Sequence, residues 1–104
     1  MQSLSLTPEK ENKVASYVGF ALRSGGAVLG TDNIRAAKGI KLIITDSALS
    51  RNSAKRVEAY AEREGITAVC VGKLSEICKK EAVKALGIKN IELAKAILNT
   101  IQSN

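Results

Sequence analysis

The chain contains no histidine and no tryptophan, and Tyr17, Phe20 and Tyr60 are its only aromatic residues. Without histidine there can be no histidine-based catalytic triad, no imidazole general base and no histidine metal ligand. So few aromatic residues also argue against the RNA-binding modules that stack several bases on an aromatic platform. We expect Tyr17 and Phe20 to pack in the core or at its rim.

Cysteine is scarce too, and long apolar runs are absent. Cys70 and Cys78 are the only thiols, and their spacing is that of neither a metal knuckle nor a redox pair. This predicts two reduced thiols in the cytosol, with Cys70 buried and inert in an apolar strand. No apolar run approaches the ~20 residues that span a membrane, and no leader precedes the first helix signal. We therefore expect a cytoplasmic protein that does not bind membranes.

Basic residues are present in excess. The chain has 104 residues and a net charge of +6, with 45% hydrophobic and 25% charged residues. This length suffices for one hydrophobic core but not for two, so residues 1–104 are predicted to form a single domain. The positive charge suits a polyanion such as nucleic acid, although many soluble proteins of similar charge have no such partner.

Hydrophobic periodicity and capping residues predict alternating helices and strands. Thr7 and Asn90 are expected to cap helices, and Gly39 to follow the end of one. Met1 to Leu6 is expected to fray. The predicted elements are a helix over Pro8–Ser24, a strand over Ala27–Leu29, a helix of about two turns within Gly30–Gly39, a strand over Ile40–Thr45, a helix capped by Ser50 or Asn52 and ending near Glu64, a strand over Ile66–Val71, a helix over Leu74–Lys79, a strand over Ala82–Ile88 and a helix from Asn90.

The run Ile40–Thr45 is the strongest strand signal. It is almost continuously apolar and branched, which is typical of a strand buried on both faces. Strands that alternate with helices form mixed or mostly parallel sheets with right-handed crossovers between helical layers. We therefore predict an α/β fold, a three-layer α-β-α sandwich with a four-stranded mixed sheet.

The stretch Gly30–Gly39 is the most informative for function. A glycine opens it, small polar residues follow, and a short helix is expected whose N-terminus faces outward at the end of a strand. Such helix N-termini bind anions through free N–H groups and the helix dipole. Ile34 should face the core, leaving Arg35 and Lys38 nearer to solvent. A plain strand-to-helix turn explains the same residues.

Several further segments carry a family resemblance. They are Gly19–Gly25, Val28 with Gly30, Lys41–Asp46, Ser50–Lys55, Gly87–Ile88 and Leu93–Ile97. Through them the chain resembles, from about Val18 to Leu98, the kink-turn RNA-binding ribosomal protein family. That family includes an archaeal large-subunit protein, its eukaryotic ribosomal and small-nucleolar-particle relatives, and small bacterial homologues.

The resemblance implies where RNA would bind. In the family the RNA-reading element has the pattern Gly-x-Asn-Glu-x-x-Lys at the N-terminus of a short helix, and the loop before the last strand lies beside it. Here Gly30 matches, while Asp32, Asn33 and Ala36 stand where Asn, Glu and Lys would be. The RNA-binding residues implied in this way, together with neighbouring polar and basic residues, are Gly30, Thr31, Asp32, Asn33, Arg35, Lys38, Lys79 and Lys80.

These observations favour a non-enzymatic, monomeric RNA-binding protein without metal or cofactor. Its partner would be structured RNA of the ribosome, together with ribosomal proteins. A protein-interaction adaptor of the same fold, which has lost kink-turn recognition, is the alternative. A nucleotide-binding enzyme that uses Gly30 is weaker, because the chain lacks the glycine series of a dinucleotide loop and the Gly-Lys-Ser/Thr of a phosphate loop. Lys79 and Lys80 also suit an ordinary solvated helix end.

Overall fold

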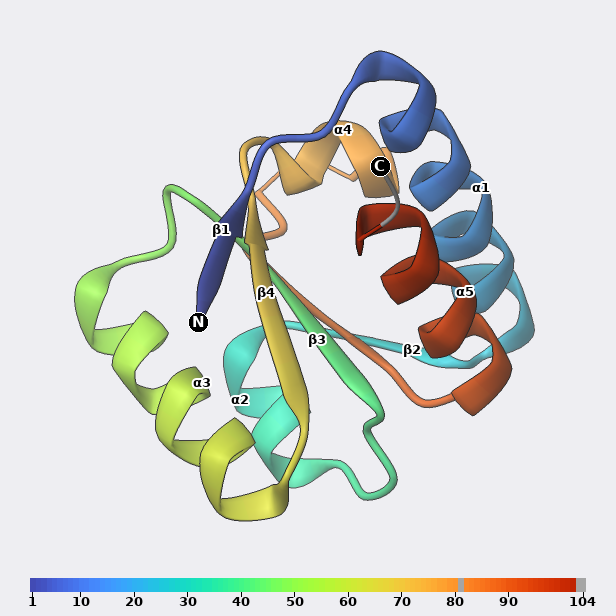
Figure 1. The fold of residues 1–104 in the computed structure, drawn as a ribbon. Helices are drawn as coiled ribbons and strands as arrows, with labels where there is room; N and C mark the ends of the chain where they lie inside the picture. Colours follow the sequence, from blue (N-terminus) through green and yellow to red (C-terminus); the bar gives the residue numbers. More distant parts are fainter. Residues whose placement is uncertain (81, 103–104) are drawn as a thin grey trace.

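The computed structural model describes residues 1–80 and 82–102 (Figure 1). Helices and strands alternate over this range, as the periodicity predicts. The elements are β1 (Gln2–Leu4), α1 (Pro8–Ser24), β2 (Ala27–Leu29), α2 (Thr31–Ala36), β3 (Leu42–Asp46), α3 (Arg51–Glu64), β4 (Thr67–Val71), α4 (Leu74–Cys78), β5 (Ala85–Ile88) and α5 (Ile91–Gln102).

Within the described residues, five strands form one mixed sheet, in the order β1-β4-β3-β5-β2. The prediction of four strands was therefore wrong. The pairs β1–β4 and β3–β4 are parallel, whereas β5 runs antiparallel to both β3 and β2. The additional strand is β1, which aligns Ser3 with Cys70 and Leu4 with Val71. Its three residues are too few to show a period, and its pairing partner lies far along the chain.

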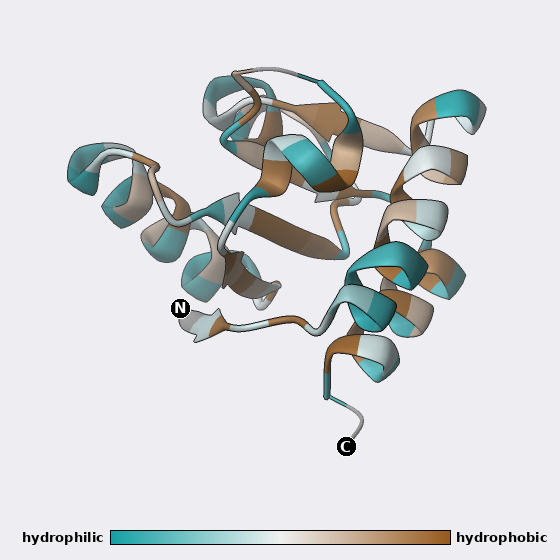
Figure 2. Cartoon of the chain, turned by 90° about the horizontal axis from the view of Figure 1, so that it is seen from above, coloured by the Kyte–Doolittle hydropathy of each residue, from teal (hydrophilic) through white to brown (hydrophobic). Residues whose placement is uncertain are grey.

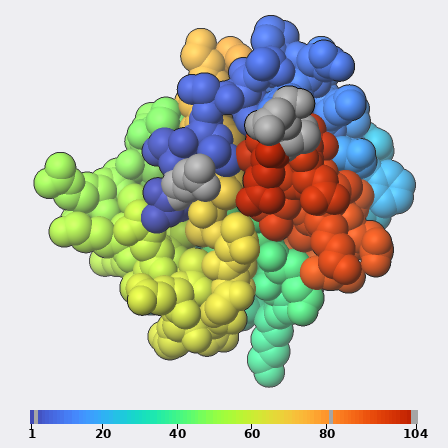
Figure 3. Space-filling view, in the orientation of Figure 1, coloured from blue at the N-terminus to red at the C-terminus, as the bar shows by residue number. Residues whose placement is uncertain are grey.

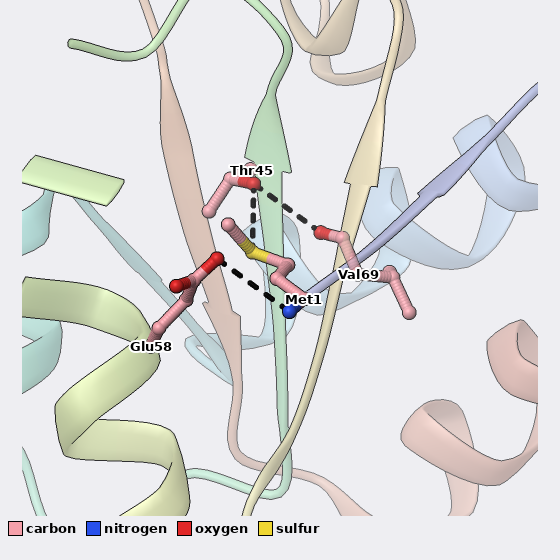
Figure 4. A network of polar contacts seen from close by, with 4 residues as sticks. All are labelled: Met1, Thr45, Glu58 and Val69. Carbon is pink, nitrogen blue, oxygen red and sulfur yellow. Dashed lines mark hydrogen bonds and ion pairs between the residues drawn. The ribbon is translucent and has the colours of Figure 1, made fainter. Parts of the chain in front are cut away.

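A polar network holds Met1 beside the sheet, where fraying was expected (Figure 4). The Met1 amino group forms an ion pair with Glu58 Oε1 of α3, at 3.5 Å. The Thr45 hydroxyl lies 3.2 Å from Met1 Sδ and 3.4 Å from the Val69 carbonyl oxygen. It has a single proton, so it donates to one of these acceptors at a time. The network satisfies the buried Thr45 and ties β1 to α3.

Helices cover both faces of the sheet. On one face α1, α4 and α5 enclose a cluster that includes Val18, Leu74 and Ile97, together with side chains of β3, β4 and β5. On the other face α2 and α3 enclose a second cluster, which includes Ile34 and Val57. Figure 2 shows apolar strands between helices that turn hydrophilic segments outward, and Figure 3 shows α5 against α1. Every residue of β3 is buried, as its apolar run predicts.

Capping side chains begin several helices as the sequence indicates. Thr7 Oγ1 accepts an N–H of the first turn of α1, and Asn90 Oδ1 accepts two from α5. Ser50, rather than Asn52, caps α3 by accepting the Ser53 N–H at 3.2 Å. Each side chain satisfies donors that a helix N-terminus otherwise leaves without a partner.

Several boundaries and burials differ from the prediction. The last strand begins at Ala85 instead of Ala82, and α2 ends at Ala36, so Gly39 lies in the following loop and not at C′. Phe20 is 53% exposed, and Cys70 is half-buried. No helix in the described part of the chain is long and apolar enough to cross a membrane.

Candidate functional site

The sheet topology brings the turn at Gly30 beside the loop that precedes β5. Because β2 and β5 are antiparallel, the residue after β2 lies next to the residue that begins β5. Leu29 is aligned with Leu86, and the Gly30 N–H donates to the Ala85 carbonyl oxygen at 3.0 Å. The loop from Lys79 therefore reaches the sheet next to the start of α2, as the family resemblance implies.

Gly30 takes a conformation that favours glycine. Its φ is 92°, and it is the N-cap residue of α2. No side chain caps this helix, and the Asn33 side chain turns back instead, with Nδ2 donating to the Leu29 carbonyl oxygen at 2.9 Å. Asp32 is exposed and Thr31 is half-buried. The turn is therefore open to a ligand, but the Asn33 amide nitrogen already has a partner within the protein.

Arg35 and Lys38 lie differently from each other. Arg35 is exposed on α2, whose Ile34 is fully buried on the sheet, whereas Lys38 follows the helix. The helix ends because Ala37 is extended, with ψ 156°, and its carbonyl oxygen accepts the Tyr60 hydroxyl at 3.3 Å. Lys38 is thus at the α3 end of α2, away from Gly30. The structure does not bring it into one group with Lys79 and Lys80.

Lys79 and Lys80 border a groove of about 570 Å³ on the α1 side of the sheet. Both are exposed, and Lys79 ends α4 in the left-handed conformation, with φ 58°. The groove is lined by Gly19, Leu22, Arg23, Leu29, Cys78, Lys79 and Lys80. Leu29, which lines the groove, immediately precedes Gly30, so the groove lies next to the open turn.

Arg23 belongs to this groove but was not among the residues predicted for the site. It lies in the last turn of α1 and is exposed. None of the ion pairs within residues 1–80 and 82–102 uses Arg23, Lys79 or Lys80. The sequence signal for Arg23 was weak, because a basic residue before Gly25-Gly26 is also what a helix C-terminus favours.

The carboxylate of Asp46 positions α4, which carries the two lysines. Asp46 Oδ2 accepts the Leu74 N–H at 2.9 Å, and Oδ1 accepts the Ala48 N–H at 2.7 Å. The side chain is buried, with 5% of its surface exposed. Asp46 therefore accepts hydrogen bonds from the turn that follows β3 and from the start of α4. Its oxygens are engaged by backbone donors, so its role here is structural.

Two further observations concern other kinds of site. A larger groove, of about 650 Å³, lies between α1 and α5, but Glu9 lines it together with Lys10 and Lys13, so its charge is mixed. In the part of the chain that the structure describes, no three His, Cys, Asp or Glu side chains gather as a metal ion would need. The groove beside Gly30 therefore remains the strongest candidate for binding an anion.

Comparison with known proteins identifies the fold only. No family model matches the chain, and no curated protein sequence matches it. A solved structure, described as that of a protein with unknown function from Bacillus halodurans C, superposes with a TM-score of 0.81 at 19% sequence identity. The match covers 88% of this chain and 99% of that one. The two chains therefore share a fold, without evidence for a shared activity.

Proposed function

We propose that this protein is a non-enzymatic RNA-binding protein of the kink-turn ribosomal type, acting as a cytoplasmic monomer on structured, ribosomal RNA. Support comes from the sequence segments that resemble the family and from the net charge of +6. The helices on both faces of the mixed sheet agree with the three-layer sandwich expected of that family.

The observation that carries the proposal is the position of two exposed lysines, which form no ion pair with any described residue, beside an open glycine turn. Lys79 and Lys80 share a groove with Leu29, and Gly30 follows directly with an uncapped α2. A helix start without a side-chain cap and two exposed cations nearby suit an RNA backbone. The turn would contact RNA through Gly30 and Thr31, with Arg35 extending the positive surface.

The proposal predicts a strongly salt-dependent affinity for RNA. The triple variant Arg35→Ala, Lys79→Ala and Lys80→Ala removes three candidate phosphate contacts, each of which contributes a slope of about 0.7–0.9 in log K against log salt. Between 50 and 200 mM salt the wild type should therefore lose roughly 20- to 40-fold more affinity than the variant. Fluorescence anisotropy with a labelled kink-forming RNA measures both slopes.

A matched control removes the same charge elsewhere. Lys55, Arg56 and Lys95 are exposed on α3 and α5, outside the groove. The slope of log K against log salt for their triple alanine variant should differ from the wild-type slope by no more than the contribution of one phosphate contact, about 0.7–0.9. If both triple variants lose affinity equally, the net charge alone explains binding, and the proposed surface is wrong.

A protein-interaction adaptor remains the second candidate, because two residues of the turn are poorly suited to RNA. The Asn33 amide nitrogen donates to Leu29, and the exposed carboxylate of Asp32 repels phosphate. Affinity capture from cells, with and without ribonuclease, separates the two functions. Protein partners that persist after ribonuclease treatment, combined with no affinity for structured RNA, would favour the adaptor.

A further inference from the structure

The groove beside Gly30 has the chemistry of a nucleotide pocket. Its lining combines apolar side chains, Leu22, Leu29 and Cys78, with the basic Arg23, Lys79 and Lys80. Its volume of about 570 Å³ is within the range of small-ligand pockets. Apolar walls accept the face of a base, whereas cations beside them accept a phosphate.

The described residues that line the groove carry charge of one sign. Of the described residues that line it, none is acidic, and its three cations have no ion-pair partner in the described part of the chain. This separates it from the groove between α1 and α5, where Glu9 accompanies two lysines. A ligand for the groove beside Gly30 should therefore carry negative charge.

Gly19 leaves the space for this arrangement. A Cβ atom built at Gly19 would lie 3.2 Å from Arg23 Nη1, so the guanidinium extends back along α1 over the glycine. A larger side chain at this position would displace Arg23 and enter the groove that both residues line. Glycine inside a helix lowers stability relative to other residues, and at this position it leaves room for the Arg23 guanidinium.

An exposed aromatic ring lies next to these residues. Phe20 has 53% of its surface exposed and precedes Arg23 by three positions on α1. Residues three apart are neighbours on a helix surface. Proteins that bind unpaired RNA use such rings to stack bases and nearby cations to hold the backbone. Phe20 and the groove therefore indicate the same class of ligand independently.

We propose that this groove receives one unpaired nucleotide of the bound RNA. Its base lies against Leu22 and Leu29, its phosphate lies between Arg23 and the two lysines, and Phe20 stacks the adjacent base. The inference rests on the proposed function. It extends the RNA-binding surface from the turn at Gly30 to the C-terminal half of α1 and gives the exposed Phe20 a role.

The test combines a blocked groove with altered RNA. Gly19→Leu fills the groove without changing the charge and should raise helix propensity, and thermal unfolding verifies that the fold is kept. The probe is a kink-forming RNA with an unpaired bulge, in which each bulge nucleotide in turn is made abasic. Lys13→Ala is the control for Arg23→Ala, since Lys13 is an exposed cation on the same helix outside the groove.

One abasic position should weaken wild-type binding by about fivefold or more, the contribution of one base contact. Gly19→Leu should weaken binding of the intact RNA by a similar factor and show no further loss with the abasic RNA. Phe20→Ala and Arg23→Ala should also weaken binding, and Lys13→Ala should not. A tryptic peptide over residues 14–23 should crosslink to 4-thiouridine in the bulge.

Other outcomes overturn the inference separately from the proposed function. If the wild type binds the RNA but Gly19→Leu binds it equally well, the groove is not used and RNA binding by the turn still stands. If the abasic penalty persists in Gly19→Leu, the base lies elsewhere. If free uridine monophosphate binds as tightly as the RNA and competes with it, the groove is a small-molecule site. If the folded wild type binds no structured RNA, both proposals fail.

Discussion

Replacing Asp46 with asparagine should destabilise the protein substantially, although the two side chains have nearly the same size. Both carboxylate oxygens of Asp46 accept backbone N–H groups, from Ala48 at 2.7 Å and from Leu74 at 2.9 Å. Asp46 as a residue is 5% exposed, so water has little access to replace these partners. Asparagine presents one oxygen and one NH2 group, so one N–H must lose its acceptor and face another donor.

The expected cost follows from the charge on the acceptor. A hydrogen bond to a charged group contributes about 1.5–3 kcal/mol, and a buried donor left without a partner costs a similar amount. We therefore expect Asp46→Asn to lose about 2 kcal/mol of unfolding free energy, which corresponds to a Tm lower by roughly 8–16 °C for a domain of this size. Asp46→Ala should lose more, because both N–H groups then lack their acceptor.

Urea unfolding followed by circular dichroism measures the effect, with Asp32→Asn as the control. Asp32 is exposed on α2, so the same chemical change there should stay within about 0.5 kcal/mol. An Asp46→Asn protein as stable as Asp32→Asn would refute the argument that this carboxylate holds the start of α4. RNA affinity should also fall in Asp46→Asn, since α4 carries Lys79 and Lys80 into the groove.

Two further predictions concern backbone positions near the site. A Cβ at Gly87 would lie 3.0 Å from Ile40 Cδ1 and 3.2 Å from Ile34 Cγ1, so Gly87→Ala should cost about 1–3 kcal/mol in urea unfolding. Ile40→Val alone should lower the unfolding free energy by about 0.5–1.5 kcal/mol. In the Gly87→Ala background the same change should cost less, because it removes the Cδ1 atom that crowds the new Cβ. If the two costs simply add, this explanation is contradicted. Ala82 has φ 65°, a conformation that glycine adopts more readily than alanine. Ala82→Gly should therefore raise the unfolding free energy by about 0.5–1 kcal/mol, and with it the Tm. Ala59→Gly, at an exposed position of α3, should instead lower the unfolding free energy by about 1 kcal/mol. If both glycine substitutions change the stability in the same direction, Ala82 is not strained.

Local signals account for most of the elements. The predicted bounds of α1 and β2 agree with the structure, because Thr7, Pro8 and the Gly25-Gly26 pair act within a few residues of the chain. The burial of β3 was predictable for a similar reason, since its own side chains supply both apolar faces. Features of this kind depend only on residues that are close together in the chain, so they can be predicted from the sequence.

Features that depend on distant partners were missed. Gln2–Leu4 forms a strand because it pairs with the edge of β4, and these three residues alone carry no sequence signal for a strand. The helix α2 ends at Ala36, and the extended Ala37 accepts a hydrogen bond from Tyr60 of α3, so Gly39 misled the prediction as an apparent C′ residue. Phe20 was expected to pack in the core or at its rim, whereas its surface is 53% exposed.

The candidate site depends on the direction of β5, which the sequence did not determine. Had β5 run parallel to β2, the loop from Lys79 would reach the opposite end of β2, and Gly30 would have no basic neighbour from it. Because β5 is antiparallel, Gly30 bonds to Ala85, and α4 delivers Lys79 and Lys80 to the same end of the sheet. The sequence offered the residues of the turn as candidates, but it did not offer Arg23, which joins the candidate site only through the groove between α1 and the end of α4. The proposed RNA affinity of a surface assembled in this way should fall when any one of its elements is displaced, even where every side chain of the turn is retained.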